Sequence, residues 1–500
     1  MFAQEPPSEK KMIPDIPESL LDILHEIGEV GGKHAYLVGG SVRDLLLKRP
    51  TFDIDIVVEG DALRVAKEMQ KRWEGSLQVH EQFGTATVIP ADPTKPKVDF
   101  VTARRETYQK PGTLPKVESG TITEDLQRRD FSINALAMRL DAANFGEVID
   151  KTDGLADLKT GTVRVLHSKS FIDDPTRIFR ACRYAGRYDF RIADADILLI
   201  KEAVPLLAHL SGERGRNEID RVLLENNAPQ IVQELAKLGV YQAIFSGWKI
   251  SRTFSSDFQT AQQAISWASE HITEEDFQPN IVRWMSLFGI GNLHGMPIYQ
   301  IEALCFRLVL EHQLRRIASA TQVLNQEIPS KKTVRFVFEK LGLKLSQNAS
   351  IWDHNGKWGI VDAENRLTYV YENKIIYKVQ TPITAYRQLL PILDSLTETT
   401  APSKIYQMLK PFSLEALVLG YSDTNLSDVQ RKSIGDYLCT MRKIQPIITG
   451  DDLIQWGEKP GKDFGSILWE LFAAQLDNKI NSKSEAYSHF QQLKAAVIRQ

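Results

Sequence analysis

The sequence predicts an α+β fold, in which a mixed sheet with helices near the N-terminus is followed by a mostly α-helical remainder. Three observations support this class. Residues 36–60 have the pattern of a strand, a glycine turn, a short helix and a second strand. Alternating apolar residues indicate further strands at 85–89 and 98–102. From residue 171 onwards, most apolar residues recur at the spacing of amphipathic helices.

The composition indicates a globular chain, and its 500 residues suggest about three domains of ordinary size. An apolar fraction of 43% and a charged fraction of 25% provide an ample core. No secretory signal and no run long enough to span a membrane is visible. Three scattered cysteines, Cys182, Cys305 and Cys439, favour a reducing cytoplasm over a disulfide framework or a zinc site. The net charge of −3 does not indicate nucleic-acid binding, so an RNA partner would require local basic patches.

Changes in these patterns divide the chain into five predicted parts. Helical spacing of apolar residues predicts helices at 18–30 and 61–73, on either side of the strand and glycine turn. The five parts are a flexible arm at 1–17, a sheet-containing part at 18–165, a helical part at 166–230, a mostly helical part at 231–395 with a possible hairpin at 358–379, and a helical tail at 396–500.

The glycine turn is the first candidate for ligand binding. A short apolar strand ends at Gly39 and Gly40, where a backbone without Cβ atoms can approach a ligand closely. Ser41 is expected to cap the helix that runs through Leu47. The free N–H groups at a helix start suit a phosphate.

Two carboxylates follow the glycine turn. Asp53 and Asp55 are two residues apart in a predicted strand, so both face one side while Ile54 and Ile56 face the other. Adjacent carboxylates repel each other unless a cation lies between them, and beside a phosphate site such a pair suits Mg²⁺. An edge strand with one wet face is the alternative, but the preceding Gly-Gly-Ser favours the metal. Asp99, in the alternating Lys-Val-Asp-Phe-Val, is either a third carboxylate beside the pair or solvent-facing.

Residues 104–127 break every periodic pattern and predict a long loop. Residues 128–131 close it and are expected to open an apolar helix at 133–138. Two adjacent arginines and Asp130 would suit a triphosphate and a ribose hydroxyl, although an exposed ion-pair cluster is the simpler interpretation. Residues 149–166 have the composition of a turn-rich connector.

The next helix is unusually basic on one face. It is expected to start at Pro175, with Asp173 or Asp174 as its cap. Because an ordinary solvated face mixes both signs, this face needs an anion, either RNA phosphate or an acidic neighbouring element. A further arginine-bearing helix begins at 213–218. The arginines at helical spacing on the basic face are Arg177, Arg180, Arg183, Arg187 and Arg191.

Taken together, six stretches resemble the class II tRNA nucleotidyltransferase/poly(A) polymerase family, within the polymerase-β nucleotidyltransferase superfamily. They run in the family's order over residues 30–230, and the region from Thr449 to Asp477 resembles the tail of long bacterial members. The six stretches are Leu37-Val-Gly-Gly-Ser-Val-Arg-Asp, Asp53-Ile-Asp, Arg128-Arg-Asp-Phe-Ser-Ile-Asn-Ala, Gly154-Leu-Ala-Asp-Leu, Asp173-Asp-Pro-Thr-Arg-Ile-Phe-Arg-Ala-Cys-Arg-Tyr and Glu213-Arg-Gly-Arg-Asn-Glu.

The resemblance implies an enzyme with a polymerase-β-like nucleotidyltransferase head, followed by a neck, body and tail. It implies that Asp53 and Asp55 hold two Mg²⁺ ions and carry the catalysis, with Asp99 as a further candidate. It also implies that Asp174 and Arg177 read the incoming base. The residues implied around the triphosphate and ribose are Gly39, Gly40, Ser41, Arg43, Arg129 and Asp130. Arg180 and Arg183 are further candidates for nucleotide binding, and the candidates for RNA binding are Arg187, Arg191, Arg214 and Arg216.

The implied partners are ATP, CTP and the tRNA 3′ end, contacted at the acceptor stem and elbow, with no membrane and no obligate protein partner. The long loop at 104–127 favours the A-adding or poly(A)-like branch over the CC-adding one. The product stays open between CCA, a terminal A and an untemplated A tail. Outside the family, the alternatives are a nucleotidyl transferase acting on a protein or small molecule, and an inactive RNA-binding protein. The inactive protein ranks last because Asp53 and Asp55 are both present.

Overall fold

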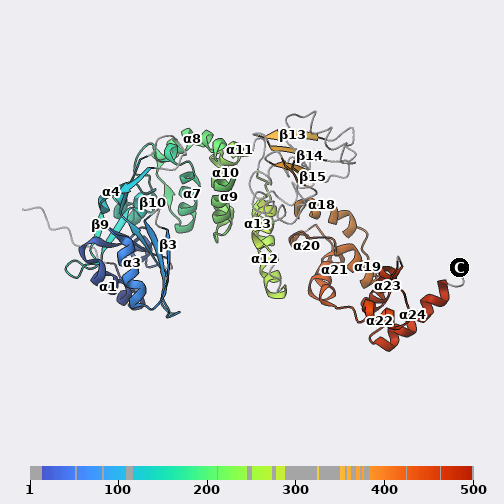
Figure 1. Ribbon diagram of the computed structural model, residues 1–500. Coiled ribbons are helices and arrows are strands. Elements are labelled where there is room, and N and C mark those ends of the chain that lie inside the picture. Colours follow the sequence, from blue (N-terminus) through green and yellow to red (C-terminus); the bar gives the residue numbers. More distant parts are fainter. Residues whose placement is uncertain are drawn as a thin grey trace, which may run out of the picture. The chain divides into compact units, whose positions relative to one another are not determined.

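The structure is a computed structural model whose described residues belong to two compact units, Met1–Lys249 and Ile250–Gln500 (Figure 1). The predicted α+β class is confirmed, since the first unit contains a mixed sheet and most of the remaining described chain is helical. None of the described helices is long and apolar enough to cross a membrane. The described residues are 14–50, 53–80, 84–107, 116–210, 212–244, 250–272, 277–287, 324–325, 350–354, 357–361, 367–371, 374–376, 382–423, 425–461 and 463–497.

A seven-stranded sheet organises the first unit, and its neighbouring strands are antiparallel except for the parallel pair β2 and β5. The strands predicted at 85–89 and 98–102 are confirmed as β4 and β5. In spatial order the strands are β3 (Ser76–His80), β4 (Thr85–Ile89), β5 (Val98–Thr102), β2 (Ile54–Val58), β1 (Ala35–Val38), β8 (Leu136–Arg139) and β9 (Val148–Asp150).

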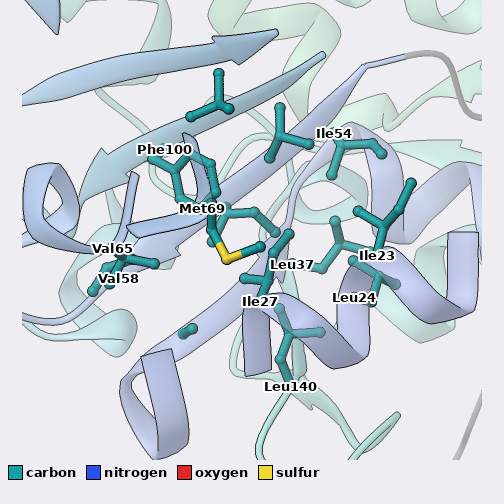
Figure 2. Packing of buried hydrophobic residues seen from close by; sticks show 14 of the residues in the cluster. Ile23, Leu24, Ile27, Leu37, Ile54, Val58, Val65, Met69, Phe100 and Leu140 are labelled. Atoms are coloured by element: carbon teal, nitrogen blue, oxygen red, sulfur yellow. The ribbon is translucent and has the colours of Figure 1, made fainter. Parts of the chain in front are cut away.

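The inner strands of this sheet contribute to two apolar layers, because successive side chains point to opposite faces. Leu37 and Val58 face the helices α1 (Glu18–Gly31) and α3 (Ala62–Arg72), and Figure 2 shows this packing around Met69. The helices predicted at 18–30 and 61–73 are therefore confirmed. Asp61 caps α3, since its side chain accepts a hydrogen bond from the backbone N–H of Arg64 at 3.0 Å.

The second face of the sheet is covered by α4 (Ile122–Gln127), whose Ile122 and Leu126 pack against Tyr36 and Val57. The expectation of a long loop at 104–127 is wrong for the described residues. β6 (Arg104–Thr107) and β7 (Lys116–Ser119) pair as antiparallel strands, and residues 108–115 between them lie outside the described chain. A capping box between Thr121 and Glu124 then starts α4.

The helix expected at 133–138 is also wrong. A single 3₁₀ turn, η3 (Ser132–Asn134), leads directly into strand β8, which pairs with β1 and β9. Leu136, Ala137 and Met138 are fully buried, because both faces of β8, which lies between β1 and β9, are covered. A short run that is apolar on both faces has no two-residue alternation, so it resembles a buried helix in the sequence.

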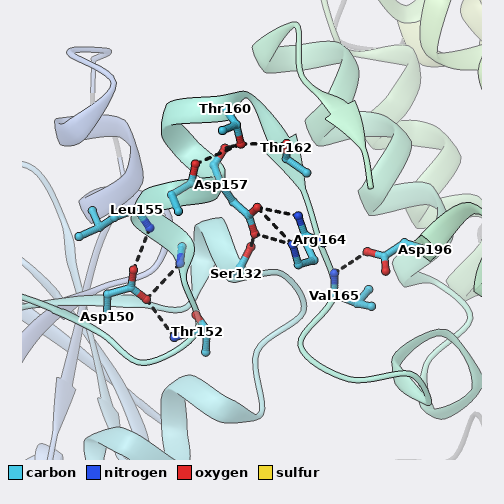
Figure 3. Close-up of polar contacts among 12 residues, drawn as sticks. Ser132, Asp150, Thr152, Leu155, Asp157, Thr160, Thr162, Arg164, Val165 and Asp196 are labelled. Atoms are coloured by element: carbon cyan, nitrogen blue, oxygen red, sulfur yellow. Dashed lines mark hydrogen bonds and ion pairs between the residues drawn. The ribbon is translucent and has the colours of Figure 1, made fainter. Parts of the chain in front are cut away.

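The turn-rich connector expected at 149–166 is more regular than predicted, since it contains β9, α5 (Gly154–Thr160) and β10 (Thr162–Val163). Figure 3 shows how carboxylates fix it. Asp150 accepts hydrogen bonds from the backbone N–H groups that start α5, including that of Leu155 at 2.9 Å. Asp157 accepts from the Ser132 hydroxyl at 2.6 Å, so the connector is tied to the segment that precedes β8.

Helices make up most of the first unit after residue 165. The basic helix α7 starts at Arg177 with Thr176 at its N-cap position, two residues later than expected from Pro175. It ends at Tyr188, because Asp189 adopts a left-handed conformation with φ 58°. The other elements are α6 (Ser170–Asp173), β11 (Arg191–Ile192), which pairs with β10, α8 (Asp194–Ala203), η4 (Val204–His209), α9 (Gly212–Leu223), α10 (Ala228–Lys237) and α11 (Val240–Ile244).

The second unit combines helices with a five-stranded sheet in the order β12, β16, β15, β14 and β13. β15 (Leu367–Tyr371) and β16 (Lys374–Ile376) confirm the predicted hairpin, whereas the wider sheet was not predicted. The remaining strands are β12 (Leu324–Asn325), β13 (Ser350–His354) and β14 (Lys357–Val361). The helices are α12 (Phe254–His271), α13 (Pro279–Leu287), α18 (Pro382–Leu393), α19 (Pro402–Leu409), α20 (Leu414–Ser422), α21 (Asp428–Cys439), η6 (Met441–Lys443), α22 (Gly450–Gln455), α23 (Phe464–Leu476) and α24 (Lys483–Val497).

Candidate active site

A polar cavity of about 890 Å³ lies within the first unit. Its walls come from the glycine turn, the start of β2, the segment before β8, and helices α7 and α9, so the sequence segments singled out above meet in space. Arginines outnumber carboxylates among its described lining residues, which favours a polyanionic ligand. The predicted site residues that line it are Gly40, Ser41, Arg43, Asp53, Asp55, Arg129, Asp130, Asp174, Arg177, Arg180, Arg183, Arg187 and Arg214. Those that do not line it are Gly39, Asp99, Arg191 and Arg216.

Asp53 and Asp55 both line the cavity, on either side of the first residue of β2. The Ser41 hydroxyl donates a hydrogen bond to the backbone carbonyl of Asp53 at 2.6 Å, which ties the glycine turn to the carboxylate pair. Burial raises the pKa of Asp55, the nearby Arg129 lowers it, and Asp99 and Asp53 raise it further. A half-buried carboxylate whose charge is disfavoured by two other carboxylates is stabilised by a bound cation. The donor set therefore fits a divalent metal ion.

Asp99 lies beside this pair but outside the cavity. It is directly opposite Asp55 in the parallel register of β2 and β5. Its carboxylate accepts a hydrogen bond from the hydroxyl of Thr87 on β4. The structure thus brings Asp99 next to Asp55, which agrees with one of the two interpretations of the sequence. The catalytic role of Asp99 stays a prediction.

At the glycine turn, the backbone lies close to the guanidinium group of Arg129. Gly39 has φ +67°, and a Cβ atom at this position would lie 2.5 Å from Nη1 of Arg129. Any side chain here would therefore displace Arg129 from the turn. The expectation that Ser41 caps the following helix is wrong. α2 (Gly40–Leu46) begins two residues earlier than expected, with Gly39 at the N-cap, and the Ser41 hydroxyl donates to the carbonyl of Asp53 instead.

Arg43 is held by partners on all sides and is only 4% exposed. Its Nε donates to Asp44 at 2.9 Å, and its Nη1 donates to the side-chain oxygen of Asn134. Its guanidinium lies 5.3 Å from the ring centre of Tyr184 and 4.6 Å from that of Tyr188, both on α7. These cation–π contacts fix Arg43 against the basic helix.

Arg128 and Arg129 share one fully buried carboxylate. Asp125 on α4 accepts from Arg128 at 2.6 Å and from Arg129 at 3.0 Å. Neither arginine is more than a fifth exposed, so the exposed ion-pair cluster considered from the sequence is wrong. Burial alone would raise the pKa of the next residue, Asp130, but Arg180 and Asn134 together lower it.

Asp174 and Arg177 are held in place at the start of α7. Arg177 is 6% exposed, and its guanidinium donates to the Ser170 hydroxyl and to the backbone carbonyl of Arg128. Oδ1 of Asp174 accepts from Nη2 of Arg214 at 2.7 Å and from the Thr176 hydroxyl at 2.7 Å. In the part of the chain that the structure describes, Oδ2 of Asp174 remains available to a ligand.

The rest of the basic face on α7 has an acidic partner, one of the two alternatives left open by the sequence. Arg187 donates to both oxygens of Glu225, at 3.0 and 2.9 Å from its Nε, and Nη1 of Arg183 lies 3.7 Å from Oε1 of Glu225. On α9, Arg216 likewise lies 3.8 Å from Asp220. Arg191 does not belong to the helical face, because the chain has left α7 and Arg191 sits exposed on β11. The RNA-binding roles expected for these arginines stay predictions.

Several cavity residues were not predicted. Asp44, Asn134 and Tyr184 line it from segments already quoted for their neighbours. Asn217, Glu218 and Arg221 line it from α9, at helical spacing from Arg214. Continuing the helical periodicity beyond Arg214 would have found them.

A mixed sheet that carries an Asp-x-Asp pair beside a glycine turn, with an arginine-lined cavity, defines a nucleotidyltransferase. Comparisons with known proteins agree. Residues 35–164 match the pattern described as "Poly A polymerase head domain", and residues 189–250 match "Probable RNA and SrmB- binding site of polymerase A". The chain belongs to the tRNA nucleotidyltransferase/poly(A) polymerase family, as the resemblance predicted. Enzymes of this family use a divalent metal ion.

Individual relatives support this assignment. The chain is 30% identical to an A-adding tRNA nucleotidyltransferase of Halalkalibacterium halodurans over 473 residues, which covers 93% of this chain and 91% of that protein. It is 41% identical to an A-adding tRNA nucleotidyltransferase of Aquifex aeolicus over 243 residues, which covers 48% of this chain and only 29% of the longer relative. A solved apo CCA-adding enzyme superimposes with a TM-score of 0.67 at 26% identity, covering 95% of this chain and 96% of that one.

Proposed function

We propose that this chain adds the terminal A to the 3′ end of tRNA, with ATP as the nucleotide donor. One observation carries the proposal: a single cavity combines the carboxylates Asp53 and Asp55 with a second pair, Asp174 and Arg177, that suits a base edge. The choice of A is supported by the relatives in Halalkalibacterium halodurans and Aquifex aeolicus, both of which are A-adding enzymes.

Asp53 and Asp55 would hold the metal, which we propose to be Mg²⁺ because hard carboxylate oxygens suit it. Held by these two carboxylates, such an ion would supply Lewis acidity, which would lower the pKa of the tRNA 3′-hydroxyl and stabilise the charge that develops on the departing pyrophosphate. The burial of Asp55 would strengthen its interaction with the ion, since electrostatic attraction increases where water is excluded. The hydroxyl of Ser41 would keep the Asp53 backbone in place through their 2.6 Å hydrogen bond.

The glycine turn and Arg129 would receive the triphosphate. Because Gly39 has no side chain, Arg129 reaches the turn while Asp125 holds the other side of its guanidinium. Arg43 would add positive charge from a fixed position between Tyr184 and Tyr188. Rigid cations of this kind stabilise developing charge without having to reorganise during the reaction.

Asp174 and Arg177 would select the incoming base. A carboxylate accepts from an exocyclic amine, which adenine and cytosine carry and uracil lacks, while a guanidinium donates to the ring nitrogen beside it. Ser170 and Arg128 hold Arg177, and Arg214 holds Asp174, so the pair is fixed before the nucleotide binds. A preformed pair of this kind discriminates better than a mobile one.

Addition of the complete CCA end is the second candidate, because the apo CCA-adding enzyme is similar over nearly the whole chain. The test uses tRNA transcripts that end at the discriminator base, at C or at CC, each supplied with ATP, CTP or both. Terminal A addition requires one A on the CC-ended RNA and no extension of the others. Extension of the discriminator-ended RNA by CCA would replace it with the second candidate, and a long run of A would indicate a poly(A) polymerase.

We further infer that the divisions expected from the sequence correspond to a catalytic head at 18–165, a base-reading neck at 166–230, a body at 231–395 and an RNA-binding tail at 396–500. The tail would hold the tRNA elbow. Truncation before Pro402 should therefore raise the KM for tRNA more than the KM for ATP. The cytoplasmic location expected from the three scattered cysteines stays a prediction.

A further inference from the structure

Two charged side chains in the cavity wall have an atom without a partner. Oε2 of Glu218 and Nε of Arg183 are both buried and make no hydrogen bond to any part of the chain that the structure describes. The two residues are 6% and 8% exposed, and both line the cavity. Because a buried polar atom is strongly disfavoured without a partner, each of these two atoms calls for a ligand.

In each side chain, a second polar atom of the same charged group lies near a residue of opposite charge. Oε1 of Glu218 accepts from Nη1 of Arg221 at 2.8 Å, and Nη1 of Arg183 lies 3.7 Å from Oε1 of Glu225. Burial lowers the pKa of Arg183, while Tyr184 and then Glu218 favour its charged form. The two side chains therefore lie within electrostatic reach of each other across α7 and α9. One presents an acceptor and the other a donor to the same cavity.

Their place along the cavity separates them from Asp174 and Arg177. Arg183 is six residues after Arg177 on the same helix, which corresponds to about 9 Å along the helix axis. That distance exceeds the width of a single base edge. The base edge read by Asp174 and Arg177 therefore does not also satisfy Arg183 and Glu218, whereas the base of a neighbouring nucleotide in the acceptor RNA can.

We propose that Glu218 and Arg183 form a second base-reading pair, which recognises a cytosine at the 3′ end of the acceptor RNA. The N4 amine of cytosine donates to a carboxylate, and its N3 accepts from an N–H group, so the two orphan atoms match its edge. Uracil presents an acceptor at position 4 and a donor at position 3, so it would leave both protein atoms unsatisfied. This inference rests on the proposed function, because it assumes that an RNA 3′ end enters the cavity.

The test compares two minihelix RNAs that differ only in a terminal C or U, with ATP as donor and single-turnover rates of A addition. The wild type should prefer the C-ended RNA. Glu218→Gln should lower the ratio of the two rates by roughly tenfold, because the Gln amide can donate to O4 of uracil. Arg183→Lys, which keeps the charge but removes the Nε donor, should also lower the ratio. Glu234→Gln, an exposed acid on α10, is the matched control and should leave it unchanged.

The ratio of the rates on the C-ended and U-ended RNAs separates base recognition from a purely structural role. Loss of a structural role would slow A addition to both RNAs equally. An unchanged ratio in both variants would overturn the inference while leaving the proposed function intact. If the wild type extended neither RNA, the proposed function would fail. The same comparison made on equilibrium binding of the two RNAs would then decide the inference, and equal affinities in wild type and variants would overturn it.

Discussion

Arg180 donates two hydrogen bonds from Nε and Nη2 to the same carboxylate oxygen, Oδ2 of Asp130, which lies 50 residues earlier in the chain. The Nε contact measures 2.8 Å. The other oxygen of Asp130 accepts from its neighbour Phe131 and from Asn134, at 2.9 and 3.0 Å. The pair therefore ties the basic helix α7 to the segment that leads into strand β8, and both residues line the cavity.

Breaking this pair should destabilise the protein. Arg180→Met leaves the buried charge of Asp130 without its main partner, and such changes cost about 3–5 kcal/mol in the free energy of unfolding. Urea unfolding at pH 7 measures the loss, with Arg191→Met as the control because Arg191 is exposed on β11. A loss no larger than that of the control would show that the pair contributes nothing to the fold.

Replacing Asp55 should stabilise the metal-free protein at neutral pH. Burial raises the pKa of Asp55 in the folded state. Between the unfolded and folded pKa values the folded state binds more protons, so its stability falls as pH rises through that window and stays lower above it. Asp55→Asn should therefore raise the Tm at pH 7 in EDTA but give no such gain near pH 3, where both states are protonated.

Thermal unfolding at the two pH values measures this difference, and Asp22→Asn on α1 provides an exposed control. Equal shifts at pH 7 and pH 3 would mean that the charge of Asp55 is not the destabilising feature.

Salt dependence should distinguish the exposed Arg191 from Arg187, which is paired with Glu225. Arg191 is exposed, so Arg191→Gln should lower the slope of log K for tRNA binding against log salt by roughly 0.7 to 0.9 for one lost phosphate contact. Arg187→Gln should change the slope less, because Glu225 already neutralises Arg187. Filter binding across a salt series measures both. The opposite order would show that Arg187 exchanges Glu225 for a phosphate when RNA binds.

Arg177→Ala should blur the choice of nucleotide. One good bidentate contact provides about 1–3 kcal/mol of discrimination between bases, so selectivity for A over U and G should fall roughly ten- to a hundredfold. Single-nucleotide addition with each of the four triphosphates measures this, and pyrophosphate release should continue. If all four rates slow together with the preference order intact, Arg177 merely supports the start of α7.

The sheet face that bears the site was predictable because its signals are local. Asp53 and Asp55 follow a glycine turn, and the apolar alternation of β4 and β5 appears in the sequence. The strand β8 was mistaken for a helix because it is buried on both faces, and no local pattern separates these cases. The hairpin β6–β7 was missed because its residues are mostly polar and its pairing depends on tertiary contacts.

Most residues of the site could be predicted from the sequence, but their hydrogen-bond and ion-pair partners could not. The arginines of α7 were found by their spacing, whereas Glu225, which pairs with Arg187 and lies 3.7 Å from Arg183, comes from a distant segment. Ser41 shows the same limit. Its position suited an N-cap, but tertiary structure placed the carbonyl of Asp53 within its reach. Partners that are distant in the sequence leave no periodic signal.

The most direct test of the account is single-turnover addition of A to a minihelix RNA ending in CC, with Mg²⁺ and ATP, by the wild type and by Asp53→Ala and Asp55→Ala. Asp22→Ala serves as the control. The account predicts one added A for the wild type and the control, and no addition by either cavity variant, with RNA affinity nearly unchanged in all four proteins. Substantial turnover by Asp53→Ala or Asp55→Ala in Mg²⁺ would contradict it, because the chemistry would then lie elsewhere.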